Sequence, residues 1–191
     1  MKPVLAITMG DVNGIGPEIL AKALAREVPW ALCRPVLFGD AEALEEARAF
    51  APGCPAAVRV ADVAAALSVT AGVPVVEAGY PAPSRRAGEL DAAAGRCAAE
   101  WVMAAVRSVV GSEAAGLVTC PINKHGIALA GYDFVGHTDL IAEMVGAADY
   151  RMCLFTDSMR IVHITAHLSM RDGIDGVRKD RIVRSVEIGH E

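Results

Sequence analysis

A histidine and a threonine that stand side by side, His137 and Thr138, are the residues best suited to chemistry, and they directly follow Gly136. An apolar-periodic segment comes next, so the pattern predicts that both lie at the start of a helix. A neutral imidazole donates or accepts hydrogen bonds, and the adjacent hydroxyl and helix-start N–H groups suit an anionic ligand. Thr138 could equally cap the helix, and the two roles are compatible. We therefore predict a polar small-molecule site here.

Two further histidines, His163 and His167, are four residues apart in a segment of period-two alternation, which predicts a strand. Four strand residues span about 13 Å, too far for both rings to bind one ion. His167, at the predicted carboxyl end of this strand, is the site candidate, and a metal there needs more ligands from elsewhere. Arg171 and Asp172 follow in a predicted loop, where they could pair with each other or orient a ligand.

Two other polar segments each follow a predicted strand. Lys124 comes just beyond 115–119, where α/β folds bind ligands, and it could neutralise a phosphate or carboxylate, although most lysines only contact solvent. The glycine-rich turn after 4–8 carries Asp11 and Asn13. Its glycines permit close approach to a ligand, but its spacing matches neither a dinucleotide fingerprint nor a Walker loop. Spacing alone therefore favours a connection with local turn bonds.

The rest of the chain supplies the elements that must position these residues. Short β-rich runs alternate with longer helical patterns, which predicts an α/β fold with helices on both faces of a sheet. The predicted strands are 4–8, 35–38, 58–60, 73–76 (weakened by Pro74), 115–119, 152–155 and 160–166. The predicted helices are 16–26, 41–50, a short one near 61–67, 90–110, 122–129, 138–145 and 177–190.

Composition narrows the class of protein. The 191 residues are 53% hydrophobic and 21% charged, enough for a large core in one domain or a domain and a half. A net charge of −5 without a Lys/Arg run disfavours nucleic acid as a partner. The five cysteines lack C-x-x-C spacing and are interpreted as reduced thiols of a cytoplasmic protein. The sequence shows no signal-peptide pattern and no membrane-spanning apolar run.

Taken in order, these motifs resemble the 4-hydroxythreonine-4-phosphate dehydrogenase family of vitamin B6 (pyridoxal phosphate) biosynthesis. The resemblance runs essentially the whole length of the chain, and the combination of motifs is specific although each alone is not. The matching pieces are Thr8-Met9-Gly10-Asp11, Gly14-Ile15-Gly16-Pro17-Glu18, Pro121-Ile122-Asn123-Lys124, Ala130-Gly131-Tyr132, Gly136-His137-Thr138, His167-Leu168 and Arg171-Asp172.

The resemblance implies an α/β/α sandwich like the isocitrate and isopropylmalate dehydrogenases, and a homodimer with active sites near the subunit interface. It implies oxidation by NAD or NADP of a secondary alcohol on 4-phosphohydroxythreonine, followed by decarboxylation. A divalent metal (zinc, magnesium or cobalt) acts as a Lewis acid. By position, His137 and Thr138 resemble substrate-binding residues and His167 resembles a metal ligand. Lys124, in the family motif Pro121-Ile122-Asn123-Lys124, is a third substrate-binding candidate, and Asp172 and Asp11 are candidate supporting residues.

Departures from the family pattern qualify these expectations. Family members are considerably longer, with two more metal-binding histidines and three more substrate-binding residues downstream. We therefore expect residues 1–191 to be the N-terminal portion of such a dehydrogenase, with the C-terminal part missing and no clear internal boundary. Val12-Asn13 replaces the commoner Pro-Ala, consistent with a related substrate such as a four-carbon sugar-acid phosphate. The alternatives are a non-catalytic module that binds a phosphorylated small molecule, or a partly folded fragment.

Overall fold

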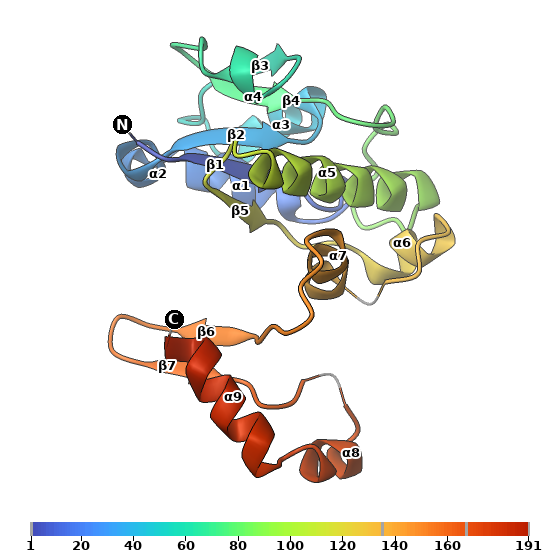
Figure 1. Ribbon diagram of the computed structural model, residues 1–191. Helices are drawn as coiled ribbons and strands as arrows, with labels where there is room; N and C mark the ends of the chain where they lie inside the picture. The colour runs from blue at the N-terminus through green and yellow to red at the C-terminus, as the bar shows by residue number, and fades with distance from the viewer. Residues whose placement is uncertain (1, 135, 167, 191) are drawn as a thin grey trace. The chain divides into compact units, whose positions relative to one another are not determined.

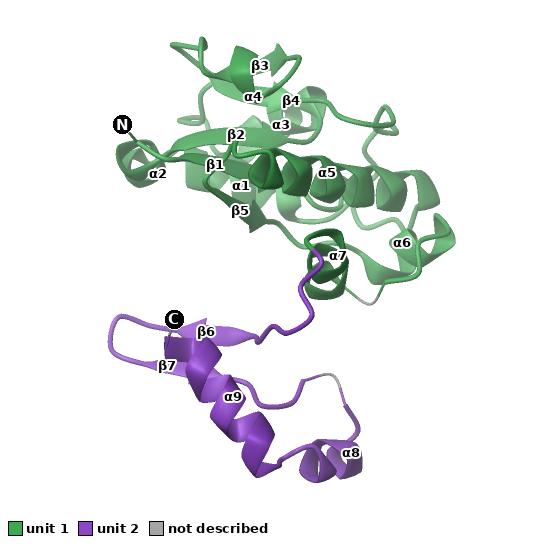
Figure 2. Ribbon diagram, in the orientation of Figure 1, with its two compact units in different colours: residues 1–145 green, residues 146–191 purple. Residues whose placement is uncertain are grey.

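The chain forms two compact units, Met1–Val145 and Gly146–Glu191, which Figure 2 distinguishes by colour. A computed structural model describes residues 2–134, 136–166 and 168–190 (Figure 1). The first unit contains a parallel sheet with its helices, and the second contains a hairpin and two helices. Within the part of the chain that is described, no helix combines the length and apolar character needed to cross a membrane.

A five-stranded parallel sheet forms the centre of the first unit, in the order β3-β4-β2-β1-β5. The strands are β1 (Val4–Thr8), β2 (Arg34–Phe38), β3 (Ala57–Val60), β4 (Val73–Val76) and β5 (Gly116–Thr119). β1 pairs with β2 from Val4↔Arg34 to Thr8↔Phe38, and with β5 from Leu5↔Gly116 to Thr8↔Thr119. Because helices cover parallel sheets on both faces, strands such as β4 are apolar at every position.

β4 lies inside the sheet despite its proline. The Val73 N–H donates to the Ala56 carbonyl on the β3 side (2.8 Å), so the nitrogen of Pro74 faces β2. The ladder between β2 and β4 begins one residue later, at Val75 paired with Leu37. Pro74 has no N–H to donate, but it lies before the first paired residue of the β2–β4 ladder, so no ladder hydrogen bond is lost. The proline was expected to weaken this strand, yet it does not confine β4 to an edge of the sheet.

Helices cover both faces of the sheet. They are α1 (Gly16–Leu24), α2 (Glu27–Leu32), α3 (Ala41–Ala47) with the 3₁₀ turn η1 (Arg48–Phe50), α4 (Val63–Ala66), α5 (Ala92–Val110), α6 (Lys124–Leu129) and α7 (His137–Met144). Right-handed crossovers put α1 and α3 on one face and α4 and α5 on the other. In Figure 1, α5 lies in front of the sheet. Trp101 of α5 is 1% exposed and belongs to the core between helix and sheet.

Local sequence explains where several of these helices begin. Asp40, Asp62, Asp91 and Asn123 immediately precede α3, α4, α5 and α6, and each side chain accepts a hydrogen bond from a first-turn N–H. Asn and Asp are among the preferred residues for this position because the side-chain oxygen satisfies an N–H group that has no partner within the helix. α2 is not among the predicted helices; it has six residues and none of them is buried.

The second unit holds the antiparallel pair β6 (Cys153–Phe155) and β7 (Arg160–Val162), followed by α8 (Met170–Asp175) and α9 (Lys179–His190). Two predictions here are wrong. The strand expected over 160–166 ends at Val162, because its partner offers only three paired residues, so the strand-spacing argument for His163 and His167 does not apply. Arg171 and Asp172 lie in α8 rather than in a loop.

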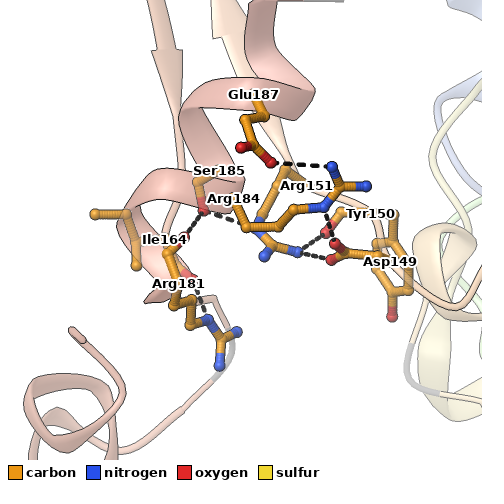
Figure 3. Close-up of polar contacts among 8 residues, drawn as sticks. All are labelled: Asp149, Tyr150, Arg151, Ile164, Arg181, Arg184, Ser185 and Glu187. Atoms are coloured by element: carbon orange, nitrogen blue, oxygen red, sulfur yellow. Dashed lines mark hydrogen bonds and ion pairs between the residues drawn. The ribbon is translucent and has the colours of Figure 1, made fainter. Parts of the chain in front are cut away.

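Polar contacts hold the second unit together (Figure 3). The Asp149 carboxylate forms ion pairs with Arg151 and with the Nε of Arg184 (2.8 Å). The other side of the Arg184 guanidinium pairs with the Glu187 carboxylate (3.2 Å). Arg151 also donates to the Ser185 hydroxyl (2.8 Å). Ser185 is the one buried residue among the described residues 146–190, so this unit lacks a hydrophobic core of its own there.

Candidate active site

The carboxyl edge of the parallel sheet is where the predicted site residues of the first unit gather. The chain leaves β1 toward α1, on one face of the sheet. It leaves the neighbouring β5 toward α6, which packs against α5 on the opposite face. Such a divergence between adjacent parallel strands opens a crevice at their carboxyl ends, and ligands of open α/β sheets bind there. Loop 9–15 follows β1 and loop 120–123 follows β5, so both loops lie at this edge.

The two loops touch each other through backbone. Gly10 has φ +74°, and a side chain at this position would place its Cβ 2.2 Å from the Pro121 carbonyl oxygen. The next N–H, of Asp11, donates to that same oxygen at 2.9 Å. Gly16 is equally restricted, because its Cβ would lie 2.0 Å from the Met9 carbonyl oxygen. Glycines at these positions therefore fix the β1–α1 turn against the end of β5.

Asn13 joins this turn to a loop that is distant in the sequence. Its buried side chain accepts from the Arg86 N–H (2.7 Å) and donates to the Glu89 carbonyl (3.3 Å), while its own carbonyl accepts from Gly88 (2.8 Å). Arg85 adds a bond from its Nε to the Val12 carbonyl (3.2 Å). From the spacing of this turn we expected local bonds only. Asp11 does make one, accepting from the Asn13 N–H at 2.9 Å, but the Asn13 amide bonds across more than seventy residues.

The Asp11 carboxyl group is nearly buried at this turn. Burial raises its pKa above the ordinary value, and the negative charge of Asp91 acts in the same direction, against the lowering effect of the Asn13 N–H. Raising the pKa of a carboxyl group means that its ionised form is disfavoured in the folded chain. Asp91 itself is the cap of α5 and is paired with Arg86.

The start of α7 brings together the three predicted substrate-binding residues. Gly136, the residue before the helix, has no side chain to cap it, and Thr138 lies inside the first turn, so Thr138 is not the N-cap residue. Lys124, at the start of α6, extends toward this point, with its Cε 3.9 Å from the position that a Cβ on Gly136 would take. His137 and Thr138 are the first two residues of α7. An ammonium group and the N-terminus of a helix thus lie side by side, an arrangement that suits an anion.

The imidazole of His137 contacts the end of β5. Burial lowers its pKa below the ordinary 6.5, against the opposing effect of a hydrogen bond to the backbone of Cys120. The ring is therefore neutral at neutral pH, and its Nε2 is buried without a hydrogen-bond partner in the described part of the chain. The Cys120 thiol beside it has its pKa raised by burial to about 11, so it stays protonated and is not a nucleophile.

The other predicted site residues lie in the second unit. His167 is outside the described residues. Asp172 accepts the Ser169 hydroxyl (2.6 Å) while its N–H donates to the same oxygen (3.2 Å), which is the capping arrangement of α8. The described residues contain no group of three His, Cys, Asp or Glu side chains placed to hold a metal ion. The convergence of His137 and His167 on one cleft stays a prediction.

One buried group at this edge escaped the sequence analysis. Thr8 ends β1 and is fully buried, and its hydroxyl has no hydrogen-bond partner among the described residues. Buried hydroxyls are usually paired. Threonine is common in strands, so a threonine at the end of an apolar strand does not by itself indicate an unpaired buried hydroxyl.

These features define a class of protein: an open parallel α/β sheet whose loops after β1 and β5 lie at the carboxyl edge, where ligands of such sheets bind. Comparison with known proteins gives the family. Residues 31–191 match the model of the family described as pyridoxal phosphate biosynthetic protein PdxA, and the chain belongs to that family. The resemblance drawn from the motifs is thereby confirmed.

Two relatives illustrate its place in the family. It is 32% identical over 190 residues to a D-threonate 4-phosphate dehydrogenase of Cupriavidus necator, covering 99% of this chain and 57% of the relative. It is 32% identical over 194 residues to a 4-hydroxythreonine-4-phosphate dehydrogenase of Desulfosudis oleivorans, covering 97% and 56%. The chain thus spans little more than half the length of these curated relatives.

Solved structures confirm the predicted fold. The crystal structure of a 4-hydroxythreonine-4-phosphate dehydrogenase from Burkholderia phymatum matches with a TM-score of 0.87 at 30% identity, covering 99% of this chain and 57% of that one. The corresponding protein of Klebsiella pneumoniae matches with a TM-score of 0.85, also at 30% identity, covering 100% of this chain and 58% of that one.

Proposed function

We propose that this chain provides the substrate-recognition edge of a dehydrogenase that oxidises a phosphorylated hydroxy acid with NAD or NADP and a divalent metal. One observation carries the proposal: Lys124 and the start of α7, with His137 and Thr138, lie together at the carboxyl edge of the sheet. The names of the relatives, which are dehydrogenases of D-threonate 4-phosphate and 4-hydroxythreonine 4-phosphate, support this reaction class.

Each of these residues has a role that follows from its chemistry. The Lys124 ammonium and the first-turn N–H groups of α7 neutralise and bind an anionic group of the substrate. The Thr138 hydroxyl, which is exposed at the same helix start, adds a donor or an acceptor. The neutral His137 imidazole can exchange hydrogen bonds with a substrate hydroxyl without adding charge. Hydride transfer to the nicotinamide and polarisation of the alcohol are supplied by the cofactor and the metal when they are bound.

Within this class we propose D-threonate 4-phosphate as the substrate, ahead of 4-phosphohydroxythreonine. The two differ at one carbon, which carries a hydroxyl in the first and an amino group in the second. Several relatives bear the first name, and Val12-Asn13 departs from the commoner family pattern in the β1–α1 turn. That turn lies at the same edge as His137, so a change there can alter which substrate is bound.

The experiment supplies both phosphorylated acids, NAD or NADP in turn, and zinc, magnesium or cobalt in turn, and follows formation of the reduced cofactor. We expect turnover of D-threonate 4-phosphate, in this chain or in one extended to the length of its relatives. Absence of turnover of either acid in the extended form, with every cofactor and metal combination, would contradict the proposal. Turnover of 4-phosphohydroxythreonine alone would overturn the choice of substrate.

A non-catalytic binding module is the second candidate, because the chain spans little more than half the length of its relatives. It predicts that this 191-residue form binds D-threonate 4-phosphate in a calorimetric titration without metal or nicotinamide, and that no combination of them yields product. Lys124→Gln should then weaken binding by about tenfold, the usual effect of losing a hydrogen bond to a charged group. A homodimer in the cytoplasm is part of the first proposal, and the mass of the particle in solution tests it.

A further inference from the structure

A second concave site lies at the opposite, amino-terminal edge of the sheet. Its volume is about 380 Å³, within the range of small-molecule pockets. It is lined by residues that precede β1, end α2, begin β2 and β4, and follow α4. All of them belong to the first unit, which has a hydrophobic core of its own. Family ligands are expected at the other edge of the sheet, so this pocket has no assigned role.

Two cationic side chains, Lys2 and Arg34, line the pocket, and none of the described residues that line it is acidic. The Lys2 ammonium donates to the Trp30 carbonyl (2.6 Å), and the Arg34 guanidinium donates to the Leu67 carbonyl. These two carbonyls lie at the ends of α2 and α4, so part of each cation's role is to satisfy a helix end.

That structural role uses only part of the available donors. An ammonium group has three N–H donors and a guanidinium five, and the contacts described account for one in each case. Neither cation forms an ion pair within the described ranges, although the chain carries a net charge of −5 and several other arginines are paired with carboxylates. A concave site with two cations and no acid attracts an anion.

The walls of the pocket are apolar. Trp30 is partly buried there with its indole N–H bonded to the Leu24 carbonyl (2.8 Å), so the ring is held in place. Cys33 and Val36 are buried beside it, and Pro74 is a further apolar wall residue. We propose that this pocket binds a small molecule that combines one anionic head group, a carboxylate or a phosphate, with an apolar body. The head group meets Lys2 and Arg34, and the body lies against the apolar wall.

Calorimetric titration of the intact chain with phenyl phosphate tests the proposal, with benzoate as the carboxylate arm. We expect one or both to bind at least about tenfold more tightly than inorganic phosphate, which lacks the body, and than phenol, which lacks the charge. Arg34→Gln and Lys2→Gln should each weaken binding by about tenfold. The matched control, Arg26→Gln, removes the same charge from an exposed residue outside the pocket and should leave binding unchanged.

Two further measurements separate this pocket from the candidate active site and from loss of folding. Lys124→Gln separates the two anion-binding regions: phenyl phosphate binding that is lost in Lys124→Gln and retained in Arg34→Gln would overturn the inference. Thermal melts of each variant show that it is folded, and Arg34→Lys, which keeps the charge, should retain most of the affinity. If neither phenyl phosphate nor benzoate binds more tightly than inorganic phosphate, the proposal is contradicted.

Discussion

Asn13 shows how one residue fixes the shape of the candidate site. Its side chain is 2% exposed. Both the oxygen and the nitrogen of its side-chain amide form hydrogen bonds with the loop that precedes α5. A residue without a side-chain amide could not make this pair of bonds, so the connection depends on Asn13. Because Arg85 lies in the same loop and donates to the Val12 carbonyl, the connection also holds a cation at the carboxyl edge of the sheet.

Asn13→Ala should lower the free energy of unfolding by about 1–3 kcal/mol, because it removes two hydrogen bonds and leaves the Arg86 N–H and the Glu89 carbonyl without their partner. Urea denaturation measures the change. Glu89→Ala is the matched control: it alters an exposed side chain of the same loop but keeps the backbone carbonyl that Asn13 contacts. An equal loss in both variants would show that the Asn13 bonds are not the cause.

His137 gives the site a dependence on pH. Because its pKa in the folded chain lies below the ordinary 6.5, the unfolded chain takes up a proton first as the pH falls. The contribution of His137 to the free energy of unfolding is therefore fully present above about pH 6.5. It is lost as the pH falls from there toward the lower pKa of His137 in the folded chain. His137→Gln should remove this part of the decline in urea denaturation curves measured across that window. The exposed His125 is the control, and His125→Gln should leave the decline in place.

At the level of elements, the close crossing of α5 and α6 positions the whole carboxyl edge. Gly95 of α5 faces Gly126 of α6, and a Cβ on Gly95 would lie 2.1 Å from the Gly126 carbonyl carbon. Only a helix surface without a side chain permits this approach. The crossing places the start of α6, and therefore Lys124, beside the capping residue Asp91 and the β1–α1 turn.

The substitution Gly95→Ala has two opposing effects on the free energy of unfolding. Alanine favours a helix interior over glycine by about 0.5–1 kcal/mol. Against this, the clash is with backbone, which cannot rotate away, and overpacking typically costs about 1–3 kcal/mol or more. We therefore expect net destabilisation, measured as a lower midpoint in urea. Gly53→Ala, where the nearest atom to the new Cβ is 3.7 Å away, should be close to neutral. A stabilised Gly95→Ala variant would show that the helices are further apart than described.

The elements also show what sequence alone could predict. The apolar run of β1 gave its bounds, Val4–Thr8, because a strand covered on both faces must be apolar throughout. The alternation around Arg160 extended beyond β7, because hydrogen bonding to a partner strand, not alternation, decides where a strand ends. In the site, Gly136-His137-Thr138 was visible as a local pattern. The bonds of Asn13 to residues 86 and 89 were not, because they depend on how the chain folds back.

On the scale of the whole molecule, the two units are stabilised in different ways. The first has a large core that includes Trp101, Leu44 and Val75. The second has large exposed apolar side chains, with Phe155 at 78% and Met170 at 85%, and depends on the ion pairs and hydrogen bonds around Arg151 and Arg184. Each solvent-exposed ion pair typically contributes only about 0–1 kcal/mol to stability. Most of the folding free energy therefore resides in the apolar core of the first unit.

Amide hydrogen exchange followed by mass spectrometry tests this difference in the intact chain. Exchange from a core strand requires global unfolding, whereas a segment with few buried apolar contacts opens locally at a lower free energy. We expect peptides from β1, β2 and α5 to be protected far longer than peptides from β6, β7 and α9. High salt should speed exchange in the second unit selectively, because it screens the pairs of Asp149 and Glu187 with Arg184. Equal protection in the two units would mean that residues 146–190 are covered by contacts beyond those described, such as a second copy of the chain, and that their exposed apolar side chains are not exposed in solution.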